Sequence, residues 1–552
     1  MNREARTHEA EASNKAVSSP GRSGRSGMSG RSGRSGRSAI FVAAGILTSR
    51  LAGFARLRAF AYYFGLESDA ADAFNAGFRI PNFLQNLFGE GALSASFIPV
   101  YAALLAREDR READRVAGAV ASLLALIVAI LVLAGVLATP LLIEVIAPGF
   151  KGAKRELTIE IVRILFPGAG LLVLSAWCLG VLNSHQRFLL SYTAPVMWNA
   201  AMIVTLVLYG HSPLPQLAII LAWGSVAGSA LQFAVQLPVV LRLARDLKFT
   251  LDVASDQVRA VMKNFVPVFI SRGVVQVSAY IDALLASLLP TGAVTGLANA
   301  QLLYTLPVSL FGMSISAAEL PAMSGVMGKD PSGIETVRRR LNAGLRQIAF
   351  FVVPSAVAFL LLGDVVAAAL LETGRFTHAD AVYVWGILAG SGVGLLASTL
   401  GRLYASTYYA LRDTRTPLRY ALLRVALTTA LGYVFAFPLP RWLEIPPIWG
   451  AAGLTASAGL AGWVEMLLLR RTLNSQIGNT GLDTGFVIKL WSSAFAAATV
   501  AWLVKLNLPV FHPLVTAILV LGPYGLVFFG MTFVLGIPEA RKTIALGKYF
   551  SS

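Results

Sequence analysis

The stretch TSRLAGFARLRAFAYYFG, residues 48–65, combines the apolarity of a membrane helix with three arginines. It lies in an apolar run, 39–64, that is long enough to cross the hydrocarbon core as a helix. Arg50, Arg56 and Arg58 would lie at or near membrane depth, where each guanidinium costs about 2.5–3.5 kcal/mol on insertion scales. A side chain that expensive is expected to face a cavity or a partner. The stretch therefore predicts a membrane helix that borders a polar space.

The composition of the whole chain also indicates a membrane protein. Its 552 residues are 56% hydrophobic and 14% charged, and the mean hydropathy is +0.67. Soluble domains are about 45–50% apolar and about 25% charged, so we expect an all-α polytopic membrane protein. Lys and Arg in cytoplasmic loops account for the net charge of +17, and we expect no nucleic-acid partner. The single cysteine, Cys178, excludes an intrachain disulfide.

A window of about 20 apolar residues identifies fourteen candidate transmembrane helices. Alternate loops in this series are rich in Lys and Arg, so both termini are expected in the cytoplasm. On the opposite side, the loop with Lys151, Lys154 and Arg155 is the one exception. Kinks are expected in the spans that contain Pro81, Pro99, Pro307 and Pro321. The expected spans are 39–64, 72–105, 116–146, 157–183, 190–210, 216–240, 258–289, 293–327, 338–371, 378–410, 417–438, 447–470, 485–506 and 513–537.

The first 38 residues differ in composition from the rest of the chain. Residues 21–38 read GRSGRSGMSGRSGRSGRS, with Met28 as the single apolar side chain. Such a segment cannot bury enough apolar surface to offset its ordering entropy, so we expect residues 1–38 to be disordered. A basic tail of this kind is attracted weakly to anionic lipid.

An internal repeat divides the apolar part of the chain. Short segments recur in the same order at an offset of about 222–225 residues, which covers six expected helices. Two parallel six-helix lobes are therefore predicted, at 39–250 and 251–475, with two further helices in 476–552. A substrate site would lie between the lobes near the midplane. The recurring pairs are ASFIP at 95–99 with AAELP at 317–321, APGF at 147–150 with TGRF at 373–376, and NSHQRFLLSYTAP at 183–195 with STYYALRDTRTP at 406–417.

Two interpretations of the arginines stay open at this point. In the first, they are structural: Arg58 reaches a membrane interface, and Arg50 pairs with Glu90 or Glu319. In the second, they line a cavity for an anionic headgroup, because guanidinium binds two phosphate oxygens and keeps its charge when dehydrated. Further candidate cations are Arg79, in FRIPNF, and Arg272, in SRGVVQ; candidate structural or ion-linked carboxylates are Asp72, Glu90, Asp282 and Glu319.

No enzymatic centre is predicted. The five histidines are scattered and show no metal-ligand spacing. A membrane glycosyltransferase would need carboxylates or metal ligands on an extramembrane loop, and the loops here are short. We therefore expect no metal and no cofactor, and a membrane potential or an ion gradient as the energy source.

Four segments carry a resemblance to a known family. They are SRLAGFAR at 49–56, DAFNAGFRIPNFLQNLFGEGALSASFIPVYAALL at 72–105, GVLNSHQRF at 180–188 and YALRDTRTP at 409–417. These resemble the MurJ (MviN) family of lipid II flippases, part of the multidrug/oligosaccharidyl-lipid/polysaccharide exporter superfamily. The resemblance implies two six-helix lobes plus two C-terminal helices that form a groove for the lipid tail. It also implies a bacterial inner-membrane protein that moves undecaprenyl-pyrophosphate-linked disaccharide-pentapeptide from the inner to the outer leaflet.

Carried over to this chain, the arginines of the family's cavity fall on Arg50 and Arg56. At other positions the chain departs from the family: Leu57 replaces an acidic residue, Gln85-Asn86 replaces one or two basic residues, and Gln301 replaces an arginine. Neutral amides donate hydrogen bonds but supply no charge. Arg79, Arg58 or Arg272 would then restore part of the positive field.

These departures leave several functions open. Besides lipid II, the cargo could be another polyprenyl-pyrophosphate-linked glycan, or the chain could be a cation-coupled exporter of the same superfamily. A scaffold that keeps the fold without transporting is a further alternative. Membrane lipids are expected partners, and cell-wall synthesis proteins are candidates.

Overall fold

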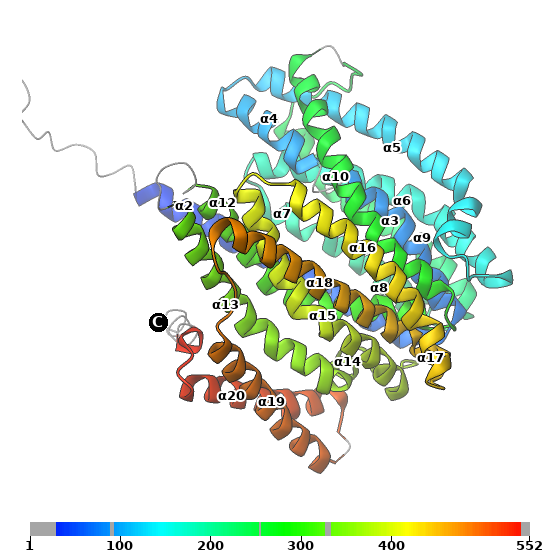
Figure 1. Ribbon diagram of the computed structural model, residues 1–552. Helices are drawn as coiled ribbons and strands as arrows, with labels where there is room; N and C mark the ends of the chain where they lie inside the picture. The colour runs from blue at the N-terminus through cyan, green and yellow to red at the C-terminus, as the bar shows by residue number, and fades with distance from the viewer. Residues whose placement is uncertain (1–28, 89–92, 253–254, 326–332, 510, 542–552) are drawn as a thin grey trace, which may run out of the picture.

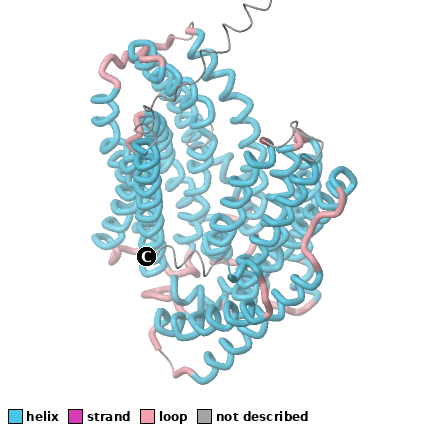
Figure 2. Tube along the Cα trace, turned by 90° about the vertical axis from the view of Figure 1, so that its left-hand side faces the viewer, coloured by secondary structure: helices cyan, strands magenta, loops and turns pink. Residues whose placement is uncertain are grey.

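The apolar segments of the chain form long helices that run roughly side by side (Figures 1 and 2). The computed structural model describes residues 29–88, 93–252, 255–325, 333–509 and 511–541. Within these ranges the chain is helical, with short connections and no β-strand beyond one isolated bridge. The predicted all-α membrane fold is therefore confirmed.

The first part of the chain folds back and forth in helices that share one core. Buried apolar side chains of α3, α5 and α6 contribute to this core, which continues into the second part of the chain. A second cluster joins the C-terminal part of α2 to α8 and α9. The bounds are α2 (Ser29–Phe64), α3 (Asp69–Phe88), α4 (Ser94–Ala106), α5 (Arg110–Ile146), α6 (Gly152–Ser184), α7 (Phe188–Thr193), α8 (Pro195–Tyr209) and α9 (Leu214–Leu243).

The second part of the chain repeats this arrangement around α15. Helix α15 packs against α13 and α18, while α16 covers α18. The bounds are α10 (Asp256–Ser287), α11 (Ala293–Pro307), the π-helix η2 (Val308–Met313), α12 (Ser314–Ser324), α13 (Gly333–Leu361), α14 (Gly363–Leu371), α15 (His378–Ala410), α16 (Arg415–Ala436), α17 (Pro438–Trp442), the 3₁₀-helix η3 (Pro447–Trp449), α18 (Gly450–Ile477), α19 (Thr484–Asn507) and α20 (Pro513–Val534).

Eleven helical segments among the described residues are long and apolar enough to cross a membrane. Each of them coincides with one of the fourteen expected spans. The remaining three expected spans fall on α2, α3–α4 and α10, which carry charged side chains within their apolar runs. The count of fourteen thus stays a prediction. Of the four prolines at which kinks were expected, Pro307 coincides with the passage from α11 into the π-helix η2. The other three lie inside helices: Pro81 in α3, Pro99 in α4 and Pro321 in α12.

Helix α2 begins earlier than the sequence suggested. It starts at Ser29, so residues 29–38, which were expected to be disordered, are helical. Once a helix has formed in the apolar run, each added residue gains a hydrogen bond at little further cost, and this favours its extension. Residues 1–28 of the predicted tail lie outside the described part of the chain.

Helices α19 and α20 pack onto the second part of the chain. They contact α13 and α14. Tyr524 donates a hydrogen bond to the Pro354 carbonyl at 2.6 Å, and Trp502 donates one to the Leu361 carbonyl at 2.9 Å. Arg346 forms an ion pair with Glu539 at 2.8 Å. These contacts tie the pair to the part of α13 between Arg346 and Leu361.

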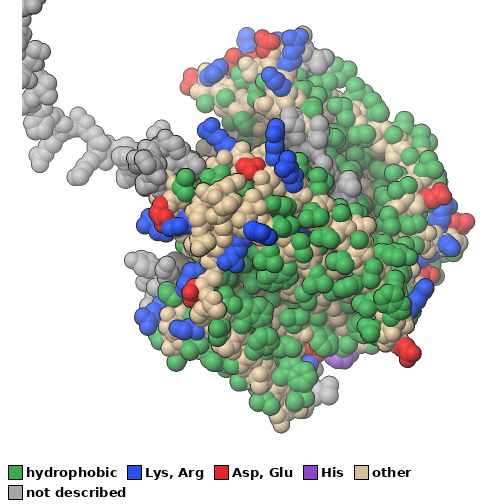
Figure 3. Space-filling model, in the orientation of Figure 1, with side chains coloured by type: hydrophobic (Ala, Val, Ile, Leu, Met, Phe, Trp, Pro, Cys, Tyr) green, Lys and Arg blue, Asp and Glu red, His purple; other side chains and the backbone are tan. Residues whose placement is uncertain are grey.

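The surface shows the distribution expected of a membrane protein. Large apolar side chains such as Leu137 of α5 and Leu526 of α20 are mostly exposed, which is favourable only where lipid surrounds the helix. Hydrophobic side chains cover the middle of the view in Figure 3, while Lys and Arg gather along its upper and left margins. Figure 1 places the ends of α4, α12 and α13 there. One end of the bundle is therefore strongly basic.

Candidate functional site

Arg56 lies on α2 with its guanidinium against α8. Its Nε donates a hydrogen bond to the Asn199 side-chain oxygen at 3.0 Å. Its Cζ lies 4.9 Å from the centroid of the Trp198 ring. Asn199 is buried, and its amide nitrogen donates to the Pro195 carbonyl at 2.9 Å, so its oxygen is turned toward Arg56. Both partners of Arg56 are neutral. Among the described residues, no carboxylate lies within ion-pair distance of its guanidinium, so its positive charge is not neutralised.

Arg50 lies on α2, nearer to the basic end of the bundle, and its side chain is exposed. The expected pairing with Glu319 is wrong. Glu319 of α12 instead forms an ion pair with Arg340 of α13 at 3.4 Å, because these two helices are neighbours. Glu90, the other expected partner, lies outside the described residues. No ion pair of the described part of the chain includes Arg50.

Arg58 has a structural partner. Its Nη1 donates to the Ala369 carbonyl at 3.0 Å and to the Leu370 carbonyl at 3.3 Å. These are among the last carbonyls of α14, which have no partner within their own helix. Arg58 therefore caps a helix of the second half, and its guanidinium is engaged in a structural contact.

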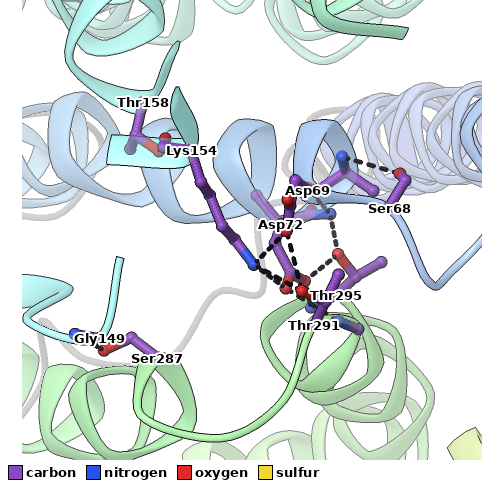
Figure 4. A network of polar contacts seen from close by, with 12 residues as sticks. Ser68, Asp69, Asp72, Gly149, Lys154, Thr158, Ser287, Thr291 and Thr295 are labelled. Carbon is purple, nitrogen blue, oxygen red and sulfur yellow. Dashed lines mark hydrogen bonds and ion pairs between the residues drawn. The ribbon is translucent and has the colours of Figure 1, made fainter. Parts of the chain in front are cut away.

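Asp72 joins the two halves of the molecule (Figure 4). It is 1% exposed and accepts hydrogen bonds from the backbone amides of Gly292 and Thr295, both at 2.9 Å, and from the Thr295 hydroxyl at 2.7 Å. These groups belong to the N-terminus of α11. A carboxylate at this position satisfies free amides and complements the positive end of the helix dipole. Lys154 of α6 supplies the opposite charge at 2.9 Å.

Further polar contacts surround Asp72. Lys154 also pairs with Asp69 at 3.1 Å, and the Thr291 hydroxyl donates to Asp69 at 2.8 Å. We call Asp69, Asp72, Lys154, Thr291 and Thr295 the Asp72 network. Because its members come from α3, α6 and the start of α11, the network fastens the two halves at the end of the bundle opposite the basic end. Asp72 here is a structural partner of a lysine.

Arg79 of α3 and Asp282 of α10 interact across the boundary between the two halves. Tyr280 of α10 donates a hydrogen bond to the Arg79 carbonyl of α3 at 2.7 Å. The Asp282 carboxylate interacts electrostatically with Arg79 and with Arg424 of α16. Part of the positive field of Arg79 is therefore offset by an acid.

The remaining predicted residues are placed as follows. Gln85 is half-buried on α3, Asn86 is exposed beside it, and Gln301 is exposed on α11. The side chain of Arg272, on α10, lies outside the described residues. The structure shows no direct contact between these amides and Arg50 or Arg56 among the interactions it describes.

Three residues that the sequence did not single out as site residues take part in these contacts: Trp198, Asn199 and Lys154. Asn199 is a polar side chain within the apolar run of α8, and this isolated position in the sequence could have marked it as a candidate site residue. Lys154, now in the first turn of α6, belongs to the predicted loop that was the exception to the alternation of Lys- and Arg-rich loops. Nothing in the local sequence distinguishes Trp198.

Comparison with solved structures identifies the class of protein. A structure described as lipid II flippase MurJ in an inward closed conformation superposes with a TM-score of 0.72 at 23% identity, covering 90% of this chain and 99% of that chain. An inward-facing multidrug resistance MATE family transporter of the MOP superfamily superposes with a TM-score of 0.63 at 17% identity, covering 77% and 95%. This chain therefore has the helical membrane fold that these two structures share. Among the described residues, no cluster of His, Cys, Asp or Glu could hold a metal.

The family follows from the sequence comparisons. The family model for lipid II flippase MurJ matches residues 60–531. A probable lipid II flippase MurJ of Rhizobium meliloti (strain 1021) is 29% identical over 465 residues, covering 83% of this chain and 84% of the relative. The lipid II flippase MurJ of Burkholderia cenocepacia is 30% identical over 439 residues, covering 78% and 82%. The chain belongs to the lipid II flippase MurJ family, and it is a multi-pass protein of the bacterial inner membrane.

Proposed function

We propose that this protein moves lipid II, the undecaprenyl-pyrophosphate-linked disaccharide-pentapeptide precursor of peptidoglycan, from the inner to the outer leaflet. The observation that carries this proposal is the environment of Arg56. Its guanidinium has neutral partners, Asn199 and Trp198 of α8, and it lies on a helix that packs against α7 and α8 of the first half and α14 of the second. No carboxylate neutralises its charge, which would therefore be available to an anionic headgroup. A forked donor of this kind binds two phosphate oxygens at once.

Arg50 would add a second cation on the cytoplasmic approach to Arg56. The exposed amides of Asn86 and Gln301 would donate hydrogen bonds to sugar or peptide groups without adding charge. In this site the arginines hold the pyrophosphate, and the amides contact the uncharged part of the headgroup. The groove of α19 and α20 would take the isoprenoid tail, which stays in lipid.

The Asp72 network would close the outer side of the carrier. With both termini in the cytoplasm, as the basic end of the bundle favours, this network would lie at the outer face, and a site at Arg50 and Arg56 would open inward. Alternating access then requires the network to break as the halves rotate. A membrane potential that is negative inside would assist export of a negative headgroup by about 2.3 kcal/mol per charge per 100 mV.

The proposal is tested with Arg50→Ala and Arg56→Ala variants, alone and together. The readouts are complementation of a cell depleted of its lipid II flippase and the appearance of precursor at the outer surface of reconstituted vesicles. We expect each single variant to reduce export at least tenfold and the double variant to abolish it. Arg111→Ala, an exposed arginine on α5, is the matched control and should retain full export. Full export by both single variants would remove Arg50 and Arg56 from the site.

A related cargo is the second candidate, and the neutral side chains of Gln85, Asn86 and Gln301 favour it. If the wild-type chain fails to complement but moves a different undecaprenyl-pyrophosphate-linked glycan in vesicles, the transport site is retained and the sugar differs. Failure to move either cargo would instead support the scaffold interpretation.

A further inference from the structure

Trp198 contacts Arg56 on α2 and is itself held in place from three sides. Its indole nitrogen donates to the buried Ser225 hydroxyl of α9 at 3.1 Å. Its ring stacks on Phe78 of α3, with centroids 5.7 Å apart and planes inclined by 27°. Its backbone is approached so closely by Gly228 that a Cβ there would lie 3.0 Å from the Trp198 Cα. The ring therefore has little freedom to turn.

The stack continues from Trp198 back to the helix that carries Arg56. Phe78 stacks on Phe74 at 6.1 Å, and Phe74 contacts Phe60 at 5.5 Å. Phe60 follows Arg56 by one helical turn on α2, so the two side chains lie on the same face. The chain of contacts thus forms a closed circuit through α2, α3 and α8. Such a circuit fixes the rotation of α2 about its axis and the direction of Arg56.

Arg56 gains a defined orientation from this arrangement. A guanidinium has five N–H donors in one plane. Asn199 accepts from Nε, and the aromatic face of Trp198 supports the plane as a cation–π partner. No described residue accepts a hydrogen bond from the two terminal nitrogens. The guanidinium edge formed by these two terminal nitrogens can donate to two oxygens of a phosphate at once.

We propose that Trp198 is a positioning residue, which with Asn199 directs the terminal nitrogens of Arg56 toward the pyrophosphate of the cargo. This inference rests on the proposed function, because it assumes that Arg56 binds the headgroup. It adds the requirement that binding depends on the orientation of the guanidinium as well as on its charge. Trp198 acts through Arg56 and has no separate contact with the pyrophosphate.

A double-mutant cycle on the full-length protein tests this inference. The probe is undecaprenyl pyrophosphate in nanodiscs, and the readout is its dissociation constant. Trp198→Leu removes the aromatic face, and we expect it to weaken binding roughly tenfold when Arg56 is present. In an Arg56→Gln background the same change should have no further effect. Trp198→Phe keeps a face and should stay within about threefold of wild type.

Two further variants guard against a folding defect. Trp223→Leu, on α9, removes a tryptophan that is 59% exposed and should leave binding unchanged. If Trp198→Leu does not fold, Trp198→Met provides comparable volume without a π-system and carries the same expectation. Each variant is first checked by its melting temperature and its elution as a single species.

The outcomes separate this inference from the proposed function. If Arg56→Gln leaves binding unchanged, the proposed site is wrong and the positioning role fails with it. If Arg56→Gln weakens binding but Trp198→Leu does not, only the positioning role is overturned. The positioning role is also overturned if Trp198→Leu weakens binding equally with and without Arg56, because the tryptophan would then be structural.

Discussion

At the scale of the residue, Asp72 is the side chain that holds the two halves together at this end of the bundle. Its carboxylate accepts three hydrogen bonds from the start of α11 and pairs with Lys154. It is buried, so no water replaces a lost partner at low cost. Asp69, in contrast, is mostly exposed and shares the same lysine. The two acids are therefore a matched pair in which only the surroundings differ.

Replacement of Asp72 by asparagine should loosen the closure. The change keeps the shape but leaves Lys154 without its buried counter-ion, and we expect a cost of about 1–3 kcal/mol. The measurement is the labelling rate of Asn75→Cys by an impermeant thiol reagent added outside, in a Cys178→Ala background. Labelling should become roughly fivefold to a hundredfold faster. Asp69→Asn should change the rate much less, and equal rates in all three proteins would show that Asp72 does not hold the closure.

The three arginines of the opening stretch show how far single residues can be predicted. Apolarity predicted that each one needs a partner or a cavity, and that holds for Arg56 and Arg58. The choice between the two was not predictable, because the partners are distant in the chain. Asn199 is 143 positions from Arg56, and Ala369 is 311 positions from Arg58. Only the tertiary packing of α2 against α8 and α14 decides which arginine remains available.

At the scale of the element, side chains of the first half cap helices of the second half. Asp72 caps the positive end of α11, and Arg58 caps the negative end of α14. Both caps come from the first half and both capped helices belong to the second. Separation of the halves on this side would leave free amides and free carbonyls at two helix ends. The closed arrangement is thus stabilised by groups that need a partner, and not by apolar contact alone.

Arg58→Leu tests the second of these caps. It removes two charge-assisted hydrogen bonds from a half-buried site, and we expect a cost of about 1 kcal/mol after allowing for exposure to water. The labelling assay at Asn75→Cys should then show a rate increase of roughly fivefold. Arg58→Lys keeps the charge but not the fork and should give an intermediate rate. A wild-type rate in Arg58→Leu would mean that water caps α14 equally well.

Helices were predictable to different degrees. Apolar runs of sufficient length fixed most of the long helices, and eleven of them meet the criterion for a membrane span. Helices α2, α3 and α10 are not among the eleven, and each carries charged residues within its apolar run. The start of α2 at Ser29 was missed because composition does not report the extension of a helix from its neighbour.

At the scale of the whole molecule, α19 and α20 form one unit with α13 and α14. Tyr524 and Trp502 bond carbonyls of α13, and Lys505 pairs with Asp364 of α14. Any rotation of the second half should carry this pair of helices along. The movable boundary is therefore the one that the Asp72 network and Arg58 cross, between the two halves.

A covalent bridge across this boundary should stop transport. Asp69 of α3 and Thr291 before α11 approach one another at 2.8 Å from opposite halves, and both lie at the exposed edge of the Asp72 network. We expect Asp69→Cys combined with Thr291→Cys, in a Cys178→Ala background, to lose export when a short thiol cross-linker or an oxidant joins the two sites. Cleavage of the disulfide by a reductant should restore export, whereas each single-cysteine variant should be insensitive to both treatments. The measurement is lipid II exposure in vesicles, together with the fraction of protein cross-linked. A fully cross-linked protein that still exports at the wild-type rate would show that the halves need not separate at this end, and alternating access about this boundary would be wrong.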